Sequence, residues 1–76
     1  MYREARLSPP ERLAAARATR FFATAFRGKC KYDRIEASSL EEAIRRAPEL
    51  YEDRGVMIYA VDSAGAYAML GSWRPE

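Results

Sequence analysis

The strongest constraint on this chain is a hairpin signal near its end. Two apolar runs lie within residues 56–73, and Ser63-Ala64-Gly65 separates them, with glycine where a three-residue turn needs a left-handed backbone. Because side chains alternate between the two faces of a strand, both predicted faces are apolar and each needs a cover. One face carries Val56, Ile58, Ala60, Ala66, Ala68 and Leu70; the other carries Met57, Tyr59, Val61, Tyr67, Met69 and Trp73.

A helix expected over residues 39–51 is the natural cover for the first of these faces. Ser38 and Ser39 each precede a glutamate by three residues, which is a capping-box pattern, and apolar residues then recur at helical spacing. Pro48 predicts a kink or a break, since proline cannot donate its backbone hydrogen bond inside a helix. The alanines at 60 and 68 are small, so this helix can approach the hairpin closely.

An earlier helix is predicted to begin at Ser8, where Pro9 suits the first helical position and Glu11 completes a capping box. Its end is ambiguous. In one reading the helix runs on through residues 19–27. In the other it ends near Ala18 and residues 20–27 and 30–37 form a hairpin around Gly28-Lys29. The polar segment 30–37 resembles an edge strand that needs a neighbour, and we therefore favour the hairpin.

The predicted fold is a single two-layer α+β domain over residues 1–76, with the order αββαββ and a mostly antiparallel four-stranded sheet. The long-helix alternative gives αβαββ with three strands. Residues 1–7 are expected to be a flexible arm and residues 74–76 a tail. A chain of 76 residues gives a small core, and small domains without disulfides or metals often gain stability by forming oligomers.

Several chemistries lack the residues that they need. The chain has no histidine and a single cysteine, Cys30, so histidine-based triads, disulfides and the usual metal cages are not expected. The four glycines are isolated, which argues against a phosphate loop or a dinucleotide fingerprint. We therefore expect no enzyme activity, no cofactor and no metal. Apolar runs are too short to cross a membrane, the first residues lack the apolar stretch of a secretory signal, and a single free thiol suits a reducing compartment, so we expect a cytoplasmic protein. The Ala- and Arg-rich composition suggests a bacterial source.

The first functional hypothesis is a protein-interaction or self-assembly domain, most simply a homodimer. Its candidate interface is the aromatic and methionine face of the final hairpin, because such residues are enriched at interfaces. The alternative cover for that face is the N-terminal helix, which would make it ordinary core, or a protein partner, ligand or nucleic acid. The candidate interface residues are Met57, Tyr59, Tyr67, Met69 and Trp73.

The second hypothesis is a nucleic-acid-binding module that uses the basic and aromatic stretch 17–34. Residues 1–34 contain nine Arg or Lys against three acids, whereas residues 35–76 contain four against eight. Cations neutralise phosphates, and aromatic side chains on an open sheet can stack unpaired bases. The candidate contacts are Arg17, Arg20, Arg27, Lys29, Lys31 and Arg34.

Overall fold

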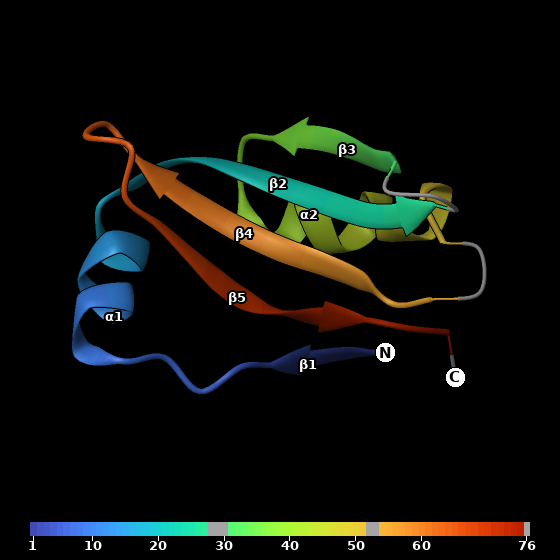
Figure 1. The fold of residues 1–76 in the computed structure, drawn as a ribbon, viewed down its shortest axis with the longest axis horizontal. Helices are drawn as coiled ribbons and strands as arrows, with labels where there is room; N and C mark the ends of the chain where they lie inside the picture. The colour runs from blue at the N-terminus through green and yellow to red at the C-terminus, as the bar shows by residue number, and fades with distance from the viewer. Residues whose placement is uncertain (28–30, 52–53, 76) are drawn as a thin grey trace.

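The computed structural model describes residues 1–27, 31–51 and 54–75, and at the facing ends of two strands, residues 26–27 and 31–32, it describes the backbone alone (Figure 1). Two helices, a short 3-10 turn and five strands follow one another along the described chain. They are β1 (Tyr2–Glu4), α1 (Pro9–Ala16), β2 (Ala18–Arg27), β3 (Lys31–Ala37), α2 (Leu40–Arg46), η1 (Ala47–Glu49), β4 (Val56–Asp62) and β5 (Tyr67–Trp73).

The strands form one open antiparallel sheet in the order β1-β5-β4-β2-β3. The predicted α+β class and the mostly antiparallel sheet are confirmed, but the predicted four strands were too few. The fifth strand is β1, which lies in the segment expected to be an arm and pairs Tyr2 with Trp73 and Glu4 with Gly71. Three residues are too short a stretch to show the alternation that identifies a strand in a sequence.

The ambiguous stretch 19–27 is strand, as the hairpin interpretation predicted. β2 is a central strand that pairs with β3 on one side and with β4 on the other. Its Phe and Thr residues suit a pleated, half-buried surface better than a helix. Gly28-Lys29, the predicted turn, and Cys30 lie outside the described residues.

Both predicted helix starts are present with their caps. At α1 the Ser8 backbone N–H donates to Glu11 Oε1 (3.1 Å) and the Glu11 N–H donates to Ser8 Oγ (3.4 Å). The bond from the Ser8 backbone to the carboxylate lowers the pKa of the Glu11 carboxyl. At α2 the Glu42 N–H donates to Ser39 Oγ (3.1 Å). α2 ends at Arg46, and the predicted break at Pro48 is the 3-10 turn η1.

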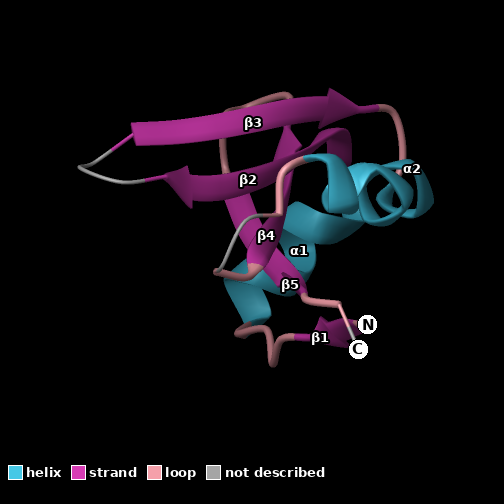
Figure 2. Ribbon diagram, turned by 90° about the vertical axis from the view of Figure 1, so that its right-hand side faces the viewer, coloured by secondary structure: helices cyan, strands magenta, loops and turns pink. Residues whose placement is uncertain are grey.

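The core lies between the sheet and the helices, on one face of the sheet (Figure 2). Ala43 and Ala47 of the α2–η1 segment are fully buried with Ala23, Val56 and Ile58 of the strands. Small side chains on both sides let the helix approach the strands closely at the packing density of a protein interior. The predicted packing of this helix is therefore confirmed at Ile58, but Ala60 and Ala68, the small residues expected to admit it, lie at the end of this face that α1 contacts.

The other end of the same face belongs to α1. This helix contacts β4 and β5, where Ala60 and Ala68 are buried. On the opposite side of the same strands Tyr67 is 68% exposed, so α1 does not cover that side. Of the described elements, neither helix covers the second face of the final hairpin.

A bulge at Leu70 changes the predicted register of the final hairpin. A three-residue turn at residues 63–65 predicts the pairs Val61–Tyr67, Tyr59–Met69 and Ile58–Leu70. The first two pairs are present, but Ile58 pairs with Gly71. One extra residue in β5 moves every later side chain to the other face. Trp73 therefore pairs with Val56 and packs against the core, contrary to its predicted place among the interface residues.

Candidate functional site

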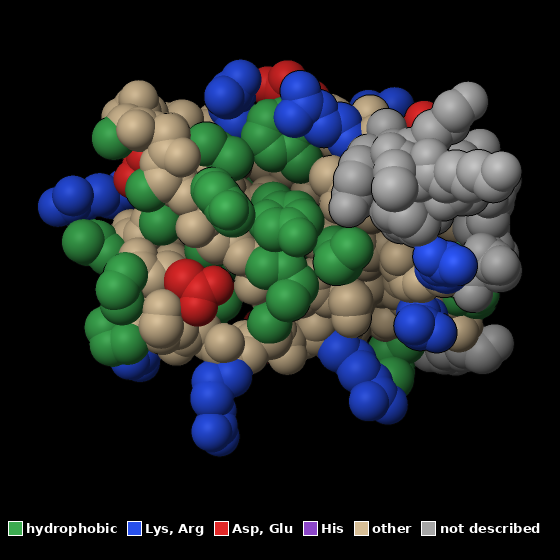
Figure 3. All heavy atoms as spheres, in the orientation of Figure 1, with side chains coloured by type: hydrophobic (Ala, Val, Ile, Leu, Met, Phe, Trp, Pro, Cys, Tyr) green, Lys and Arg blue, Asp and Glu red, His purple; other side chains and the backbone are tan. Residues whose placement is uncertain are grey.

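The second face of the sheet, which we call the open face, carries aromatic and sulfur-containing side chains at its centre. Figure 3 shows hydrophobic side chains gathered over the middle strands, with Lys and Arg around the margin and some Asp and Glu side chains between them, including beside the hydrophobic side chains at the left. Tyr67 is strongly exposed, its neighbours are half-buried, and Phe22 is buried. The central set consists of Phe22, Met57, Tyr59, Val61, Tyr67 and Met69.

Four of the five predicted interface residues meet on this face. The rings of Tyr59 and Tyr67 are 6.1 Å apart in an edge-to-face arrangement, and the Tyr59 hydroxyl lies 3.9 Å from the Met57 sulfur. Met69 pairs with Tyr59 across the strands. The strands of the packed sheet hold these side chains in place. Their role as an interface stays a prediction. Trp73, the fifth residue, instead contacts Tyr51 on the core side, with ring centroids 5.9 Å apart.

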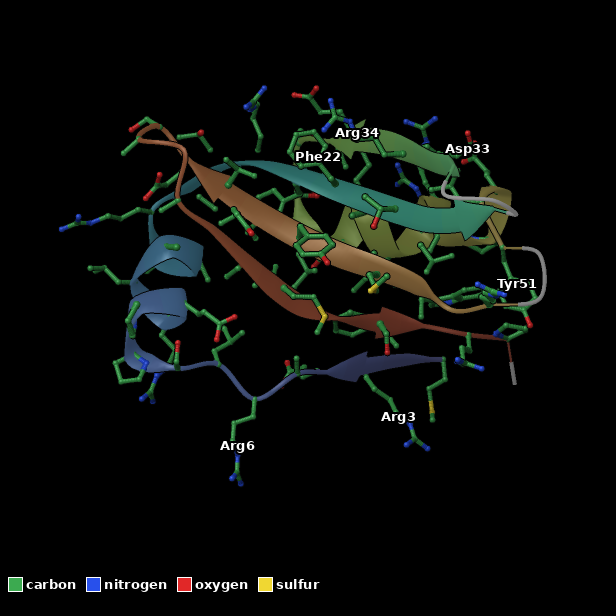
Figure 4. All side chains as sticks on the ribbon, viewed as in Figure 1. Arg3, Arg6, Phe22, Asp33, Arg34 and Tyr51 are labelled. Atoms are coloured by element: carbon green, nitrogen blue, oxygen red, sulfur yellow. The ribbon has the colours of Figure 1, made fainter. Side chains whose placement is uncertain are left out.

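Phe22 has two arginines over its ring. The guanidinium carbon of Arg20 lies 5.4 Å from the ring centroid and that of Arg34 lies 4.8 Å from it, within the range of cation–π attraction (Figure 4). Arg20 also faces Glu36 across the β2–β3 pair, with a nitrogen–oxygen distance of 3.9 Å. The two guanidinium groups are therefore held at the edge of the open face.

Two of the six residues predicted to contact nucleic acid thus lie on the open face, Arg20 and Arg34. Arg17 lies at the end of α1 as its C-cap. Arg27 and Lys31 face each other at the end of the β2–β3 hairpin, where only the backbone is described, and Lys29 is not among the described residues.

Three shallow hollows formed by described residues open on this face, and arginines line all three. The first lies among Phe22, Thr24, Arg34, Tyr59, Val61, Gly65 and Tyr67. The second lies among Arg54, Gly55, Met57, Met69, Ser72 and Arg74. The third lies among Met1, Arg3, Ser72, Arg74 and Pro75. The described lining residues include four arginines and neither aspartate nor glutamate.

Three acidic residues of the second half of the sequence lie behind the sheet. Glu41, Glu42 and Glu49 belong to the α2–η1 segment behind the sheet. Glu42 and Glu49 face arginines of the same segment, Arg45 at 4.0 Å and Arg46 at 3.2 Å. These three glutamates therefore lie away from the open face, and two of them lie close to basic partners.

The candidate residues predicted from the sequence did not include Phe22, Arg3, Arg54 or Arg74, all of which lie on this face or line its hollows. Phe22 lies within the basic and aromatic stretch 17–34 but was not named as a contact; buried Ala23 and Ala25 fix the opposite face of β2 as the core side, which puts Phe22 on the open face by simple alternation. Arg3 depends on β1, which was not predicted. The position of Arg74 depends on the bulge at Leu70, since the tail follows the shifted strand.

Other kinds of site find no support in the described part of the chain. Within residues 1–27, 31–51 and 54–75 there is no group of three or more Cys, Asp or Glu side chains placed to hold a metal ion. None of the helices there is long and apolar enough to cross a membrane. Comparison of the chain with protein-family models, curated proteins and solved structures gives no significant match.

Proposed function

We propose that the protein is a non-enzymatic binding domain that engages another macromolecule through the open face. The observation that supports this proposal is the position of both helices on the opposite face of the sheet. Tyr59, Tyr67 and their methionine neighbours are left to be covered by something other than the described helices. Apolar patches with a polar or charged margin are typical of interaction sites.

The residue types and their support also suit binding. Tyr, Met and Arg are enriched at interfaces, and aromatic side chains contribute large contact areas for little loss of conformational entropy. Tyr67 pairs with Val61 in the sheet, so its backbone is fixed before a partner arrives. A rigid platform of this kind lowers the entropic cost of association.

A second copy of the chain is the first occupant to test, because the sequence predicts a homodimer. Light scattering at increasing protein concentration measures the molar mass directly. A filter-retention assay with labelled single-stranded and duplex nucleic acid measures binding of the other predicted occupant. The proposal requires association in at least one of these assays.

The decisive comparison is Tyr67→Glu against Leu13→Glu. Both residues are large, apolar and exposed, at 68% and 52%, but Leu13 lies on α1 and Tyr67 on the open face. Each change should alter the free energy of unfolding by only about 0.5 kcal/mol, as is usual for surface substitutions. Tyr67→Glu should abolish association and Leu13→Glu should preserve it. Equal loss in both variants, or no association by the wild type, would refute the proposal.

A further inference from the structure

We infer that the occupant of the open face is single-stranded nucleic acid, with unpaired bases on the tyrosines and phosphates on the surrounding arginines. This inference rests on the proposed function and names its partner. It differs from the sequence-based hypothesis in the residues that bind the nucleic acid. The predicted contacts lay within residues 17–34, whereas the face that the structure assembles draws on strands from both ends of the chain.

The margin of the open face is positively charged. Arginines from opposite edges of the sheet surround the apolar centre: Arg34 on β3 at one edge and Arg3 on β1 at the other, as Figure 4 shows. Arg74 lines two of the three hollows. Among the described strand residues on this face, the one acid is Glu36, which faces Arg20. A polyanion complements such a margin, whereas a second copy stacked on the same face would bring arginines against arginines.

The open face also exposes aromatic surface on which a base can stack. The strongly exposed Tyr67 ring stands edge-on to Tyr59 at the first hollow, where an unpaired base can stack on it. Phe22 has a different role, because Arg20 and Arg34 already lie over its ring. Its ring holds these two guanidinium groups in place, and guanidinium planes also stack on bases. Bases inside a duplex are paired and stacked, so this surface selects single strands.

The arrangement of the hollows gives a path across the sheet. The first hollow includes Tyr59, whose strand partner Met69 lines the second, and Ser72 and Arg74 are shared by the second and third. The path therefore runs from β3 towards β1, across the strands. Stacking on a sheet of this size accommodates about two or three bases.

The experiment is a fluorescence anisotropy titration of the full chain with fluorescein-labelled oligonucleotides of about 12 nucleotides. Single-stranded RNA, single-stranded DNA and duplex DNA of one mixed sequence are compared at about 50 and about 200 mM salt. Three arginines on phosphates (Arg3, Arg34 and Arg74) predict a slope of about −2 in log affinity against log salt, or roughly a 20-fold loss over this range. Both single strands should bind more tightly than the duplex. The RNA and DNA arms show which of the two binds more tightly.

Two variants test the assigned residues, and a third is their control. Tyr67→Ala should weaken single-strand binding about tenfold by removing one stacking surface. Arg34→Ala should reduce the salt slope by about 0.7, the contribution of one phosphate. The matched control is Arg45→Ala, which removes the same charge from α2, where the side chain is 76% exposed, and should leave the slope unchanged. Circular dichroism verifies that each variant is folded.

The results that would overturn the inference also show whether the proposed binding function fails with it. Equal affinity for duplex and single strands, or equal effects of Arg34→Ala and Arg45→Ala, means attraction to overall charge without a stacking site. No nucleic-acid binding at about 50 mM salt, together with a dimer that Tyr67→Glu dissociates, refutes this inference and keeps the proposed function. Absence of both kinds of association refutes the two together.

Discussion

Gly71→Ala tests the structural account of the β1–β5 pair, on which the third hollow depends. A Cβ added at Gly71 would meet the Arg3 carbonyl oxygen of β1 and would lie 2.6 Å from the Tyr2 hydroxyl oxygen. Atoms in folded proteins do not approach a Cβ this closely, and the Arg3 oxygen belongs to the backbone. One added methyl group should therefore displace β1 from the sheet rather than rotate a single side chain.

The expected cost follows from what β1 contributes. Forcing a group into packed structure costs about 1–3 kcal/mol. Displacing β1 also removes backbone bonds such as Arg74 N–H to the Met1 carbonyl (3.1 Å), each worth about 1 kcal/mol net. We expect a loss of about 2–3 kcal/mol in the free energy of unfolding. For a domain of this length that corresponds to a fall in melting temperature of roughly 10–20 °C.

Urea unfolding followed by the fluorescence of Trp73, the one tryptophan of the chain, measures this cost. The control is a chain that lacks residues 2–4. Without β1 there is nothing for the added methyl group to strike, so Gly71→Ala should then be neutral or stabilise by about 0.5–1 kcal/mol through the unfolded state. A double-mutant cycle isolates this coupling. An equal cost with and without residues 2–4, or a cost below about 0.5 kcal/mol in the full chain, would show that close approach of β1 is not the reason for this glycine.

Three further changes probe the turn, the edge strand and the helix packing. Asp62→Ala removes a carboxylate that accepts two backbone N–H bonds of 2.9 Å in the β4–β5 turn; it should cost about 1–2 kcal/mol in urea unfolding, and Asp62→Asn should recover part of this. Burial, and secondarily the charge of Glu4, raises the pKa of Tyr2 above 10.0. The stability from Tyr2 is therefore complete below pH 10.0 and falls as the pH rises through the folded-state pKa; unfolding measured across this range should show the fall in the wild type and a smaller one in Tyr2→Phe. Ala43→Leu overfills a fully buried site and should cost about 1–3 kcal/mol, whereas Glu41→Leu on the exposed side of the same helix should be nearly neutral by the same measurement.

Local signals predicted most of the fold. Capping residues at Ser8 and Ser39 marked both helix starts, because a side chain must satisfy the free N–H groups wherever a helix begins. The Ser63-Ala64-Gly65 turn gave the register of the final hairpin as far as Met69, and Gly65 has the predicted positive φ of 87°. These features depend on neighbouring residues alone, so one sequence is enough to find them.

The errors arose where distant parts of the chain meet. Residues 2–4 form the strand β1 because they pair with the edge of β5, and no pattern within these three residues predicts this pairing. The bulge at Leu70 had a local signal that was overlooked, since an isolated glycine within a strand pattern indicates a bulge or a close backbone approach. Gly71 follows the bulge and is also the site of close approach by β1. A bulge predicted from this glycine would have placed Trp73 on the core side. The predicted set of residues therefore coincides with the open face over β4 and the start of β5 and omits both edges of the sheet, while its role as a binding site stays a prediction.

The β1–β5 pair also has a consequence for the order in which the molecule assembles. Its outermost bond, from the Met1 amino group to the Arg74 carbonyl, joins groups 73 positions apart, and the entropy cost of closing a loop rises with that separation. We expect this three-residue edge strand to pair late in folding and to open before the longer strands of the sheet, because it makes few contacts. Arg3 docks and undocks with it. A ligand held by Arg3 therefore stabilises the docked strand, and the docked strand raises the affinity for that ligand by the same factor, which makes β1 a coupled part of the binding equilibrium.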